Sequence, residues 1–315
     1  MPTTKSDLRN RPPAKGNKMR LAVFCLFLTC FAPITPLRAA DEGDTLQQIA
    51  KTAKIRIGYR EAEPPFSYQL PSGEITGFST DLCRAISEDI RKRLKLDRID
   101  LEYVKATPAT RFILVRSGQI DIECAATTNN SERRKMVDFS YPNFMTATQF
   151  LSRKQDNLKN LADLAGRSVT SASGTVNIEQ LNAVNRQKNL NISVMPTKTN
   201  EEAFELVVAG KASAFVMDGI LLAALAATSE NPDLYALSEE TLSAPEPYGL
   251  VFRRDDPAFK AAVNESLRQI FTGPAIHGLY EKWFTKPIPP NGMNLNLPMT
   301  ASLKEAYENP GEYRD

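Results

Sequence analysis

Short apolar runs rich in β-branched residues alternate with longer segments of helical periodicity along most of the chain. Residues 55–59 alternate apolar and polar side chains and predict a strand. A helix is expected to open at residues 77–82, because apolar residues then recur at near-helical spacing and would share one buried face. The positions on this face are Leu82, Ile86, Ile90 and Leu94.

The same alternation of strand and helix continues to the end of the chain. Further strands are predicted at residues 99–104, 120–126, 168–170, 192–194 and 214–218. Further helices are predicted at residues 46–51, 178–184, 201–209, 257–271 and 276–284. Asn200 is expected to cap the third of these helices and Gly210 to close it. Such an order of elements is typical of open α/β sheets.

Two segments, residues 144–152 and 248–253, are β-like and carry no helix signal. We interpret them as crossovers into and out of an inserted α/β domain, so the chain is expected to form two lobes with a cleft between them. Lobe 1 would contain residues 41–146 and 248–315 with a C-terminal tail, and lobe 2 residues 147–247. Ligands of open α/β sheets bind at the carboxyl ends of strands.

Residues 1–40 have the composition of a cleaved secretory signal. Lys15, Lys18 and Arg20 precede an apolar run at residues 21–32, and small residues follow at positions 39–40. The apolar run is short for a membrane span. Met19 is an alternative start of translation.

Charge and cysteine content do not alter the predicted fold. Residues 1–40 contain seven of the 39 Lys and Arg and one of the 37 Asp and Glu, which leaves 32 basic and 36 acidic residues. The mature chain is therefore slightly acidic and offers no nucleic-acid patch. Only Cys83 and Cys124 remain after cleavage, and they are either a disulfide or two buried thiols.

Several kinds of chemistry lack the residues that they need. His277 is the only histidine, and no paired cysteine spacing accompanies it, so no transition-metal site is expected. The chain has no glycine-rich phosphate loop and no G-x-S-x-G nucleophile turn. We therefore predict no cofactor.

The segment 127–142 is the most informative stretch. After a predicted strand, Thr127 and Thr128 are followed by Asn and Ser, which suit a helix N-cap, and Arg133 falls on the first turn. Hydroxyls, backbone N–H groups and a guanidinium at one strand end form a ready carboxylate site. The alternative is a capped surface helix with a solvated arginine.

Several linked phrases resemble one family, the amino-acid-binding solute receptors of bacterial ABC importers. These phrases are residues 58–61 with 65–68, 127–140, 173–175, 217–218, 248–249, and 281–284 with 287–290. The resemblance runs from about Thr45 to Pro298. It implies a two-lobed periplasmic-binding-protein fold of type II, with two crossover strands as the hinge.

The resemblance also implies roles for individual residues. Arg133 would clamp the α-carboxylate of an amino acid, with help from the Thr128 hydroxyl. Thr175 and Val176 open a helix whose free N–H groups would bind the same carboxylate from the other lobe. Asp218 would pair with the α-ammonium, although a strand-end or helix-capping aspartate is the alternative.

Arg60 and Arg111 match family positions that face the ligand's side chain. Two guanidiniums in a water-poor cleft are costly unless an anion neutralises them, which favours an acidic ligand. Family members that bind glutamate and aspartate have serine, serine, threonine and histidine at four positions where this chain has Pro108, Ala126, Val176 and Asn200. Ala126 and Val176 can still use their backbones. A related dicarboxylate or a larger acidic derivative therefore stays open as the ligand.

The expected function is a periplasmic, monomeric binding protein that is not an enzyme. It would capture an acidic amino acid and deliver it to a membrane permease and an ATPase on separate chains. One alternative is a periplasmic enzyme on the same fold, such as a cyclohexadienyl dehydratase, for which Glu61, Glu63 and Glu123 are the nearby candidate acids or bases. Another is a ligand receptor for a membrane sensor kinase.

Overall fold

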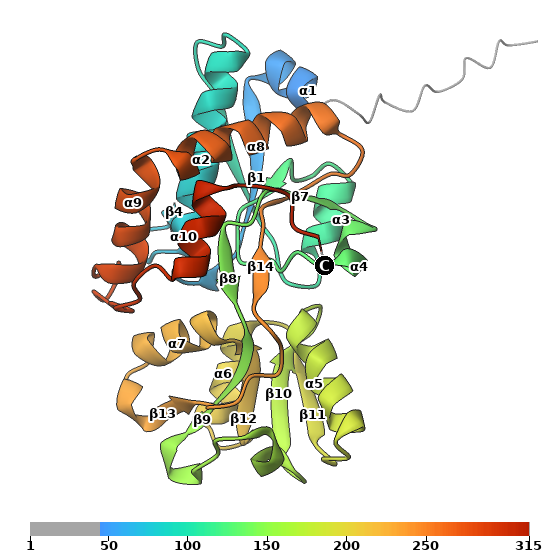
Figure 1. Cartoon of the computed structure of the whole chain (residues 1–315), viewed down its shortest axis with the longest axis vertical. Coiled ribbons are helices and arrows are strands. Elements are labelled where there is room, and N and C mark those ends of the chain that lie inside the picture. The colour runs from blue at the N-terminus through green and yellow to red at the C-terminus, as the bar shows by residue number, and fades with distance from the viewer. Residues whose placement is uncertain (1–44, 315) are drawn as a thin grey trace, which may run out of the picture. The chain divides into compact units, whose positions relative to one another are not determined.

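Two five-stranded mixed sheets form the framework of the computed structural model, which describes residues 45–314 (Figure 1). The expected secretory signal and the alternative start at Met19 lie outside these residues. The first sheet has the strand order β5-β1-β6-β15-β7. Its strands are β1 (Lys54–Tyr59), β5 (Asp100–Lys105), β6 (Ile122–Glu123), β7 (Asp138–Phe139) and β15 (Val251–Phe252).

The second sheet repeats this plan with the order β11-β10-β12-β9-β13. Its strands are β9 (Thr148–Arg153), β10 (Ser168–Ala172), β11 (Ser193–Thr197), β12 (Ala214–Asp218) and β13 (Tyr235–Leu237). In each sheet three neighbouring strands are parallel, with β5, β1 and β6 in the first and β11, β10 and β12 in the second. The remaining two strands of each sheet, β15 and β7 in the first and β9 and β13 in the second, each run antiparallel to the strand before them in the strand order. Each sheet therefore presents the carboxyl ends of three parallel strands on one edge.

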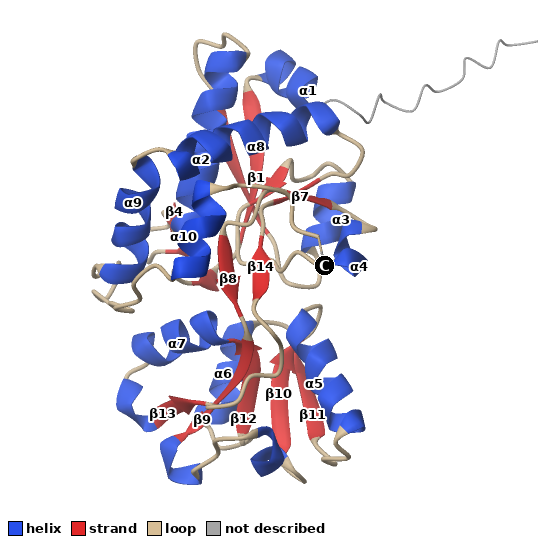
Figure 2. Ribbon diagram, in the orientation of Figure 1, coloured by secondary structure: helices blue, strands red, loops and turns tan. Residues whose placement is uncertain are grey.

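Helices pack on both sheets (Figure 2). The helices that belong to the first sheet are α1 (Thr45–Thr52), α2 (Phe78–Arg93), α3 (Arg111–Arg116), α4 (Ser131–Arg134), α8 (Pro257–Thr272), α9 (Ala275–Tyr280) and α10 (Ala301–Glu308). Those of the second sheet are α5 (Val176–Gln187), α6 (Asn200–Val208) and α7 (Gly219–Thr228). Short 3-10 turns lie at η1 (Lys154–Asp156), η2 (Leu161–Leu164) and η3 (Pro232–Leu234), and a π-helical turn, η4 (Glu281–Thr285), extends α9.

The chain passes from the first sheet to the second through β8 (Phe144–Thr146) and returns through β14 (Glu246–Tyr248). These two strands pair antiparallel, and Figure 1 shows them side by side between the two sheets. They fall within or next to the segments that the sequence predicts as crossovers. The lobe boundaries at residues 146–147 and 247–248 stay a prediction.

The predicted helix faces are buried. Leu82, Ile86 and Ile90 are inaccessible to solvent on α2, and Leu94 is half-buried just beyond its end. On α8, Phe259, Val263 and Leu267 are buried and Ile270 packs against the same core. The periodicity of apolar residues therefore placed these two helices correctly.

Two short strands follow β1, one on either side of Pro64 and Pro65. β2 (Ala62–Glu63) and β3 (Ser67–Gln69) form a small sheet with β4 (Ile75–Thr76). Phe66 lies between β2 and β3 and is fully buried, with its ring 5.0 Å from that of Phe144 and 5.2 Å from that of Tyr248. Burial of this one aromatic ring against the two connecting strands holds the segment in place.

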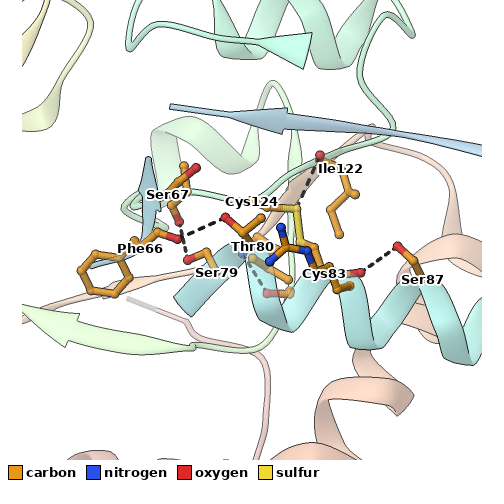
Figure 3. Close-up of a disulfide and its surroundings, with 12 residues drawn as sticks. Phe66, Ser67, Ser79, Thr80, Cys83, Ser87, Ile122 and Cys124 are labelled. Carbon is orange, nitrogen blue, oxygen red and sulfur yellow. Dashed lines mark hydrogen bonds between the residues drawn. A yellow bond between two sulfur atoms is a disulfide. The ribbon is translucent and has the colours of Figure 1, made fainter. Parts of the chain in front are cut away.

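The strand predicted at residues 120–126 is reduced to the two residues of β6. A disulfide then joins Cys124 to Cys83 of α2, with a Cα–Cα distance of 6.3 Å that lies in the usual range (Figure 3). Of the two alternatives left open by the sequence, the structure has the disulfide. It ties the chain to α2 just before residues 126–128, which belong to the candidate site.

No helix among residues 45–314 has the length and apolar character that crossing a membrane requires.

Candidate functional site

A small buried cavity lies at the carboxyl ends of strands from both sheets. Eight of the nine residues predicted to bind ligand line it: Arg60, Arg111, Ala126, Thr128, Arg133, Thr175, Val176 and Asp218. Arg60 directly follows β1, Thr175 follows β10, and Asp218 is the last residue of β12. The space left between these side chains is small, with a volume of about 10 Å³. Strand ends of this kind are the usual ligand sites of open α/β sheets.

Arg133 is buried, which rules out the alternative of a solvated surface arginine. Asn130 caps the short helix α4, as predicted from the sequence, by accepting a hydrogen bond of 2.9 Å from the Arg133 N–H. The Arg133 guanidinium donates to the Thr128 carbonyl at 2.9 Å and to the Gly174 carbonyl at 3.5 Å. Burial lowers its pKa. Within residues 45–314 it has no ion pair, so its charge is available to an anion.

The N-terminus of α5 faces the site with unpaired backbone donors. The helix begins at Val176, two residues before the predicted start, and Thr175 caps it by accepting from the Ile178 N–H at 3.3 Å. N–H groups of a first helical turn have no partner within the helix and suit an anion. Gly174, with φ of +80°, precedes the cap, and a Cβ there would lie 2.8 Å from the Pro108 carbonyl oxygen. Only glycine fits this close approach.

Asp218 supplies a buried carboxylate at the same place. It accepts hydrogen bonds from the Tyr248 hydroxyl and from the Asn177 side chain, the second at 2.8 Å. Although it precedes α7, its side chain makes no capping hydrogen bond, so the helix-capping alternative does not describe it. Burial raises its pKa, while the two hydrogen bonds and Arg133 act in the opposite direction. No Lys, Arg or His among residues 45–314 forms an ion pair with this carboxylate.

Arg111 is a second buried guanidinium that no acidic side chain of the described residues pairs with. It donates to the Pro108 carbonyl and, at 3.2 Å, to the Gly174 carbonyl. Burial, together with the nearby charges of Arg133 and Arg60, holds its pKa well below the usual range of arginine. An anion next to Arg111 would relieve this repulsion.

Arg60, unlike Arg111, has acidic partners within the protein. Its guanidinium donates to Glu123 at 3.0 Å and lies 3.8 Å from a Glu63 oxygen. The burial of Arg60 therefore needs no ligand carboxylate to compensate it, and the charge argument for an acidic ligand rests on Arg111 alone. Folding brings two internal carboxylates to it, one from β6 and one from β2, and these compensate its burial.

Glu63 lines the cavity and was not among the predicted ligand-binding residues; the sequence suggested it only as a candidate acid or base for the enzyme alternative. One of its oxygens accepts from the Ala126 N–H at 3.4 Å and the other from the Asn200 side chain at 3.5 Å. Burial, and to a lesser degree Glu123, raises its pKa to about 7 against the lowering effect of Arg60 and Arg111. A carboxyl three residues after Arg60 was a visible signal, but nothing in the sequence showed which way it faces.

Asn200, the ninth predicted residue, lines a neighbouring cavity of about 40 Å³ that shares Arg60, Glu63 and Pro108 with the first. The prediction that Asn200 caps α6 is wrong. Thr199 is the cap, accepting from the Glu202 N–H at 3.2 Å, and Asn200 is the first helical residue. Because the cap is already made, the Asn200 amide is free to bond Glu63.

Other features of the described residues offer less. Among residues 45–314 no group of three or more His, Cys, Asp or Glu could hold a metal ion. A larger hollow of about 760 Å³, open to solvent, lies between α6 and η3 but contains none of the predicted site residues. Specific capture of a small charged solute needs buried, unpaired charges, which the smaller cavity has. We therefore regard the smaller cavity as the candidate site.

Comparison with known proteins identifies relatives of this chain. Residues 55–286 match the model of the bacterial extracellular solute-binding proteins, family 3. The L-glutamate/L-aspartate-binding protein of Pseudomonas aeruginosa is 37% identical over 295 residues, which cover 93% of this chain and 97% of that protein. The glutamate/aspartate import solute-binding protein of Escherichia coli is 32% identical and covers 94% and 97%.

Solved structures agree with this relationship. An ancestral arginine-binding protein bound to arginine superposes with a TM-score of 0.66 at 28% identity, over 74% of this chain and 98% of that one. An ancestral amino acid-binding protein, described as a precursor of cyclohexadienyl dehydratase, has a TM-score of 0.66 at 29% identity, over 77% and 100%. The predicted α/β fold with two lobes and the resemblance on which it rested are both confirmed. The chain belongs to family 3 of the bacterial extracellular solute-binding proteins.

Proposed function

We propose that this protein is the solute-binding component of an ABC importer and that it captures an acidic amino acid, glutamate or aspartate or a close relative. The observation that carries the proposal is the charge pattern of the buried cavity. Within the described part of the chain, Arg111 and Arg133 are guanidiniums without an acidic partner, and Asp218 is a carboxylate without a cationic one. An acidic amino acid brings two carboxylates and one ammonium, which match these three groups.

In the proposed complex the α-carboxylate binds Arg133, the Thr128 hydroxyl and the first N–H groups of α5. The α-ammonium binds Asp218, whose remaining hydrogen bonds come from Tyr248 and Asn177. The side-chain carboxylate then lies toward Arg111. Each contact joins opposite charges away from water, where such hydrogen bonds are strongest.

The ligand would also hold the two sheets' strand ends together. Arg111 and Arg133 come from helices of the first sheet, and both donate to the carbonyl of Gly174, which follows β10 of the second. A ligand that touches both sides binds best when they are shut, so binding shifts the population toward the closed form. We propose that the closed form is what the permease recognises, with the ATPase and permease on separate chains.

Relatives support this assignment, because the two bacterial proteins with 37% and 32% identity are named for glutamate and aspartate. By the same relationship we propose that the protein acts in the periplasm as a monomer and is not an enzyme. The secretory signal that this location requires is an expectation from residues 1–40.

Isothermal titration calorimetry of the mature protein tests the function. We expect glutamate or aspartate to bind at pH 6 with at least about 100-fold higher affinity than arginine, since arginine would place a third cation beside Arg111. Histidine and leucine serve as controls for non-specific binding. Preferential binding of a basic or apolar amino acid would refute the proposed ligand class.

A second candidate function, a dehydratase acting on cyclohexadienyl acids, is favoured by one observation. Glu63 is a buried carboxyl in the cavity with its pKa raised to about 7, which suits a general acid or base. The ancestral precursor of such an enzyme also shares the fold. Incubation of the purified protein with a cyclohexadienyl acid, followed by ultraviolet absorbance of aromatic product, separates the two functions.

A further inference from the structure

Two of the residues predicted to bind the ligand, Ala126 and Asn200, already bind a carboxylate of the protein itself. The Ala126 N–H and the Asn200 side-chain amide both donate to Glu63, one to each oxygen. Arg60 lies 3.8 Å from the same carboxyl group. Glu63 thus occupies donors beside Arg60, a residue that the family resemblance assigns to the ligand's side chain.

The bonds that hold Glu63 are long. At 3.4 and 3.5 Å they lie near the outer limit of hydrogen bonding, so this buried carboxylate is weakly compensated. Glu123, by contrast, accepts from Arg60 at 3.0 Å and from Thr127 at 3.1 Å. Of the two acids, Glu123 is therefore the established partner of Arg60, and Glu63 is the one that can change its charge at small cost.

The charged residues that line the cavity, taken together with Glu123 as the ion-pair partner of Arg60, sum to zero when Glu63 is ionised. Three cations face three anions: Arg60, Arg111 and Arg133 against Glu63, Glu123 and Asp218. An acidic amino acid carries one net negative charge, so its entry would leave the site with an uncompensated anion. If Glu63 binds a proton, the sum returns to zero, and its new O–H can donate to the ligand's carboxylate.

We propose that Glu63 determines side-chain specificity and that capture of an acidic amino acid is coupled to the uptake of one proton by Glu63. This inference rests on the proposed function. A ligand with a neutral amide side chain needs no such proton, because its amide can donate to the ionised Glu63. The site therefore selects between acidic and amide side chains according to pH.

The surroundings of Glu63 support a proton on this group in the physiological range. Burial raises its pKa to about 7, with Glu123 and Glu201 of α6 acting in the same direction and Arg60 and Arg111 against it. Glu61 and Lys105 pair with each other at the rim of the neighbouring cavity.

Calorimetry across pH 5.5 to 9 tests the proposal, with glutamate and glutamine as probes. For the unmodified protein we expect glutamate affinity to be flat below pH 6 and to fall by about tenfold per pH unit well above 7. Glutamine affinity should not fall between pH 5.5 and 8, because its amide can donate to the ionised Glu63. Titration at pH 8 in buffers of different ionisation enthalpy should show uptake of about one proton per glutamate.

The variant Glu63→Gln isolates the responsible group. It should bind glutamate without proton uptake, with a flat pH profile and at least tenfold higher affinity than the unmodified protein at pH 8.5. Glu201→Gln is the matched control, because Glu201 also has a raised pKa near the site and helps to raise that of Glu63. It should keep the proton uptake and the slope of the pH dependence, with the fall in affinity beginning at a somewhat lower pH. Glu63→Ser serves as a second variant with a smaller polar side chain.

The outcomes separate this inference from the proposed function. If glutamate binds the unmodified protein with no proton uptake at pH 8, or if Glu63→Gln keeps the original slope, the role of Glu63 is refuted while the function stands. If no acidic amino acid binds at any pH but another solute does, the proposed ligand class is refuted. Folding of each variant is checked by its thermal transition without ligand. The stability of the unmodified protein should fall as pH rises from about 4.5 through 7, because the folded form holds the Glu63 proton more tightly, and Glu63→Gln should lose this decline.

Discussion

The two ends of the cavity use charge in opposite ways. At one end Arg133 donates to the Thr128 and Gly174 carbonyls, and Asp218 accepts from Tyr248 and Asn177. All four of these partners are neutral, so among the described residues neither charge is paired. At the other end Arg60 is surrounded by Glu123 and Glu63, so its charge is balanced within the protein. Arg111 lies beside both sets, unpaired.

This difference shows what a charged residue in a cleft implies. An unpaired buried charge has to be met by the ligand, because leaving it alone is costly. A paired charge instead shapes the site and sets its electrostatic potential. The amino-acid end therefore defines the class of ligand, and the side-chain end adjusts the choice within that class.

The difference between the two ends is tested most directly by replacing the unpaired charged residues one at a time. Arg133→Ala should abolish binding of both glutamate and glutarate, a dicarboxylate without an ammonium group. Asp218→Asn should lower glutamate affinity by at least about 30-fold, since it removes the partner of a buried ammonium, yet leave any glutarate binding intact. Calorimetry measures both.

Lys135→Ala is the control for these variants, because Lys135 follows Arg133 on the same turn and is exposed in a surface ion pair with Glu132. Its effect should be negligible. Equal loss of glutamate and glutarate in Asp218→Asn would contradict the assignment of the ammonium to this residue.

Stability of the side-chain end should depend on the disulfide. The double variant Cys83→Ser with Cys124→Ser removes a cross-link between residues 41 positions apart, which is expected to cost about 2–5 kcal/mol of unfolding free energy. Urea denaturation measures this loss. Since Cys124 is next to Glu123 and two residues from Ala126, we also expect the pH dependence of glutamate binding to weaken. An unchanged denaturation midpoint, with the same result for the reduced unmodified protein, would contradict the prediction.

The smallest expected effect concerns Arg111, which lies between the two ends. Arg111→Gln should lower glutamate affinity about tenfold and leave glutamine affinity nearly unchanged, because only the acidic side chain loses a charged partner. The ratio of the two dissociation constants is the measurement. Equal loss for both ligands would place Arg111 with Arg133 at the amino-acid end.

Many of the helices, strands and candidate site residues could be predicted from the sequence. The apolar spacing on α2 and α8 and the alternation at residues 55–59 depend only on local periodicity, and each was placed within a few residues. The phrase around Arg133 and the glycine before Thr175 likewise follow from local capping and turn rules. Eight predicted residues meet in one cavity because they follow, or come soon after, strand ends that share an edge.

The sequence did not determine the contacts between side chains that lie far apart along the chain. It did not decide between a disulfide and two thiols for Cys83 and Cys124, it assigned Asn200 to the wrong contact, and it treated Arg60 as a charge that awaits a ligand. Each of these depends on which side chain arrives from a distant segment. Only the packing of β2 and β6 beside Arg60 brings Glu63 and Glu123 within reach of it, and because electrostatic energy depends on distance in space, the tertiary structure alone decided the charge balance of the site.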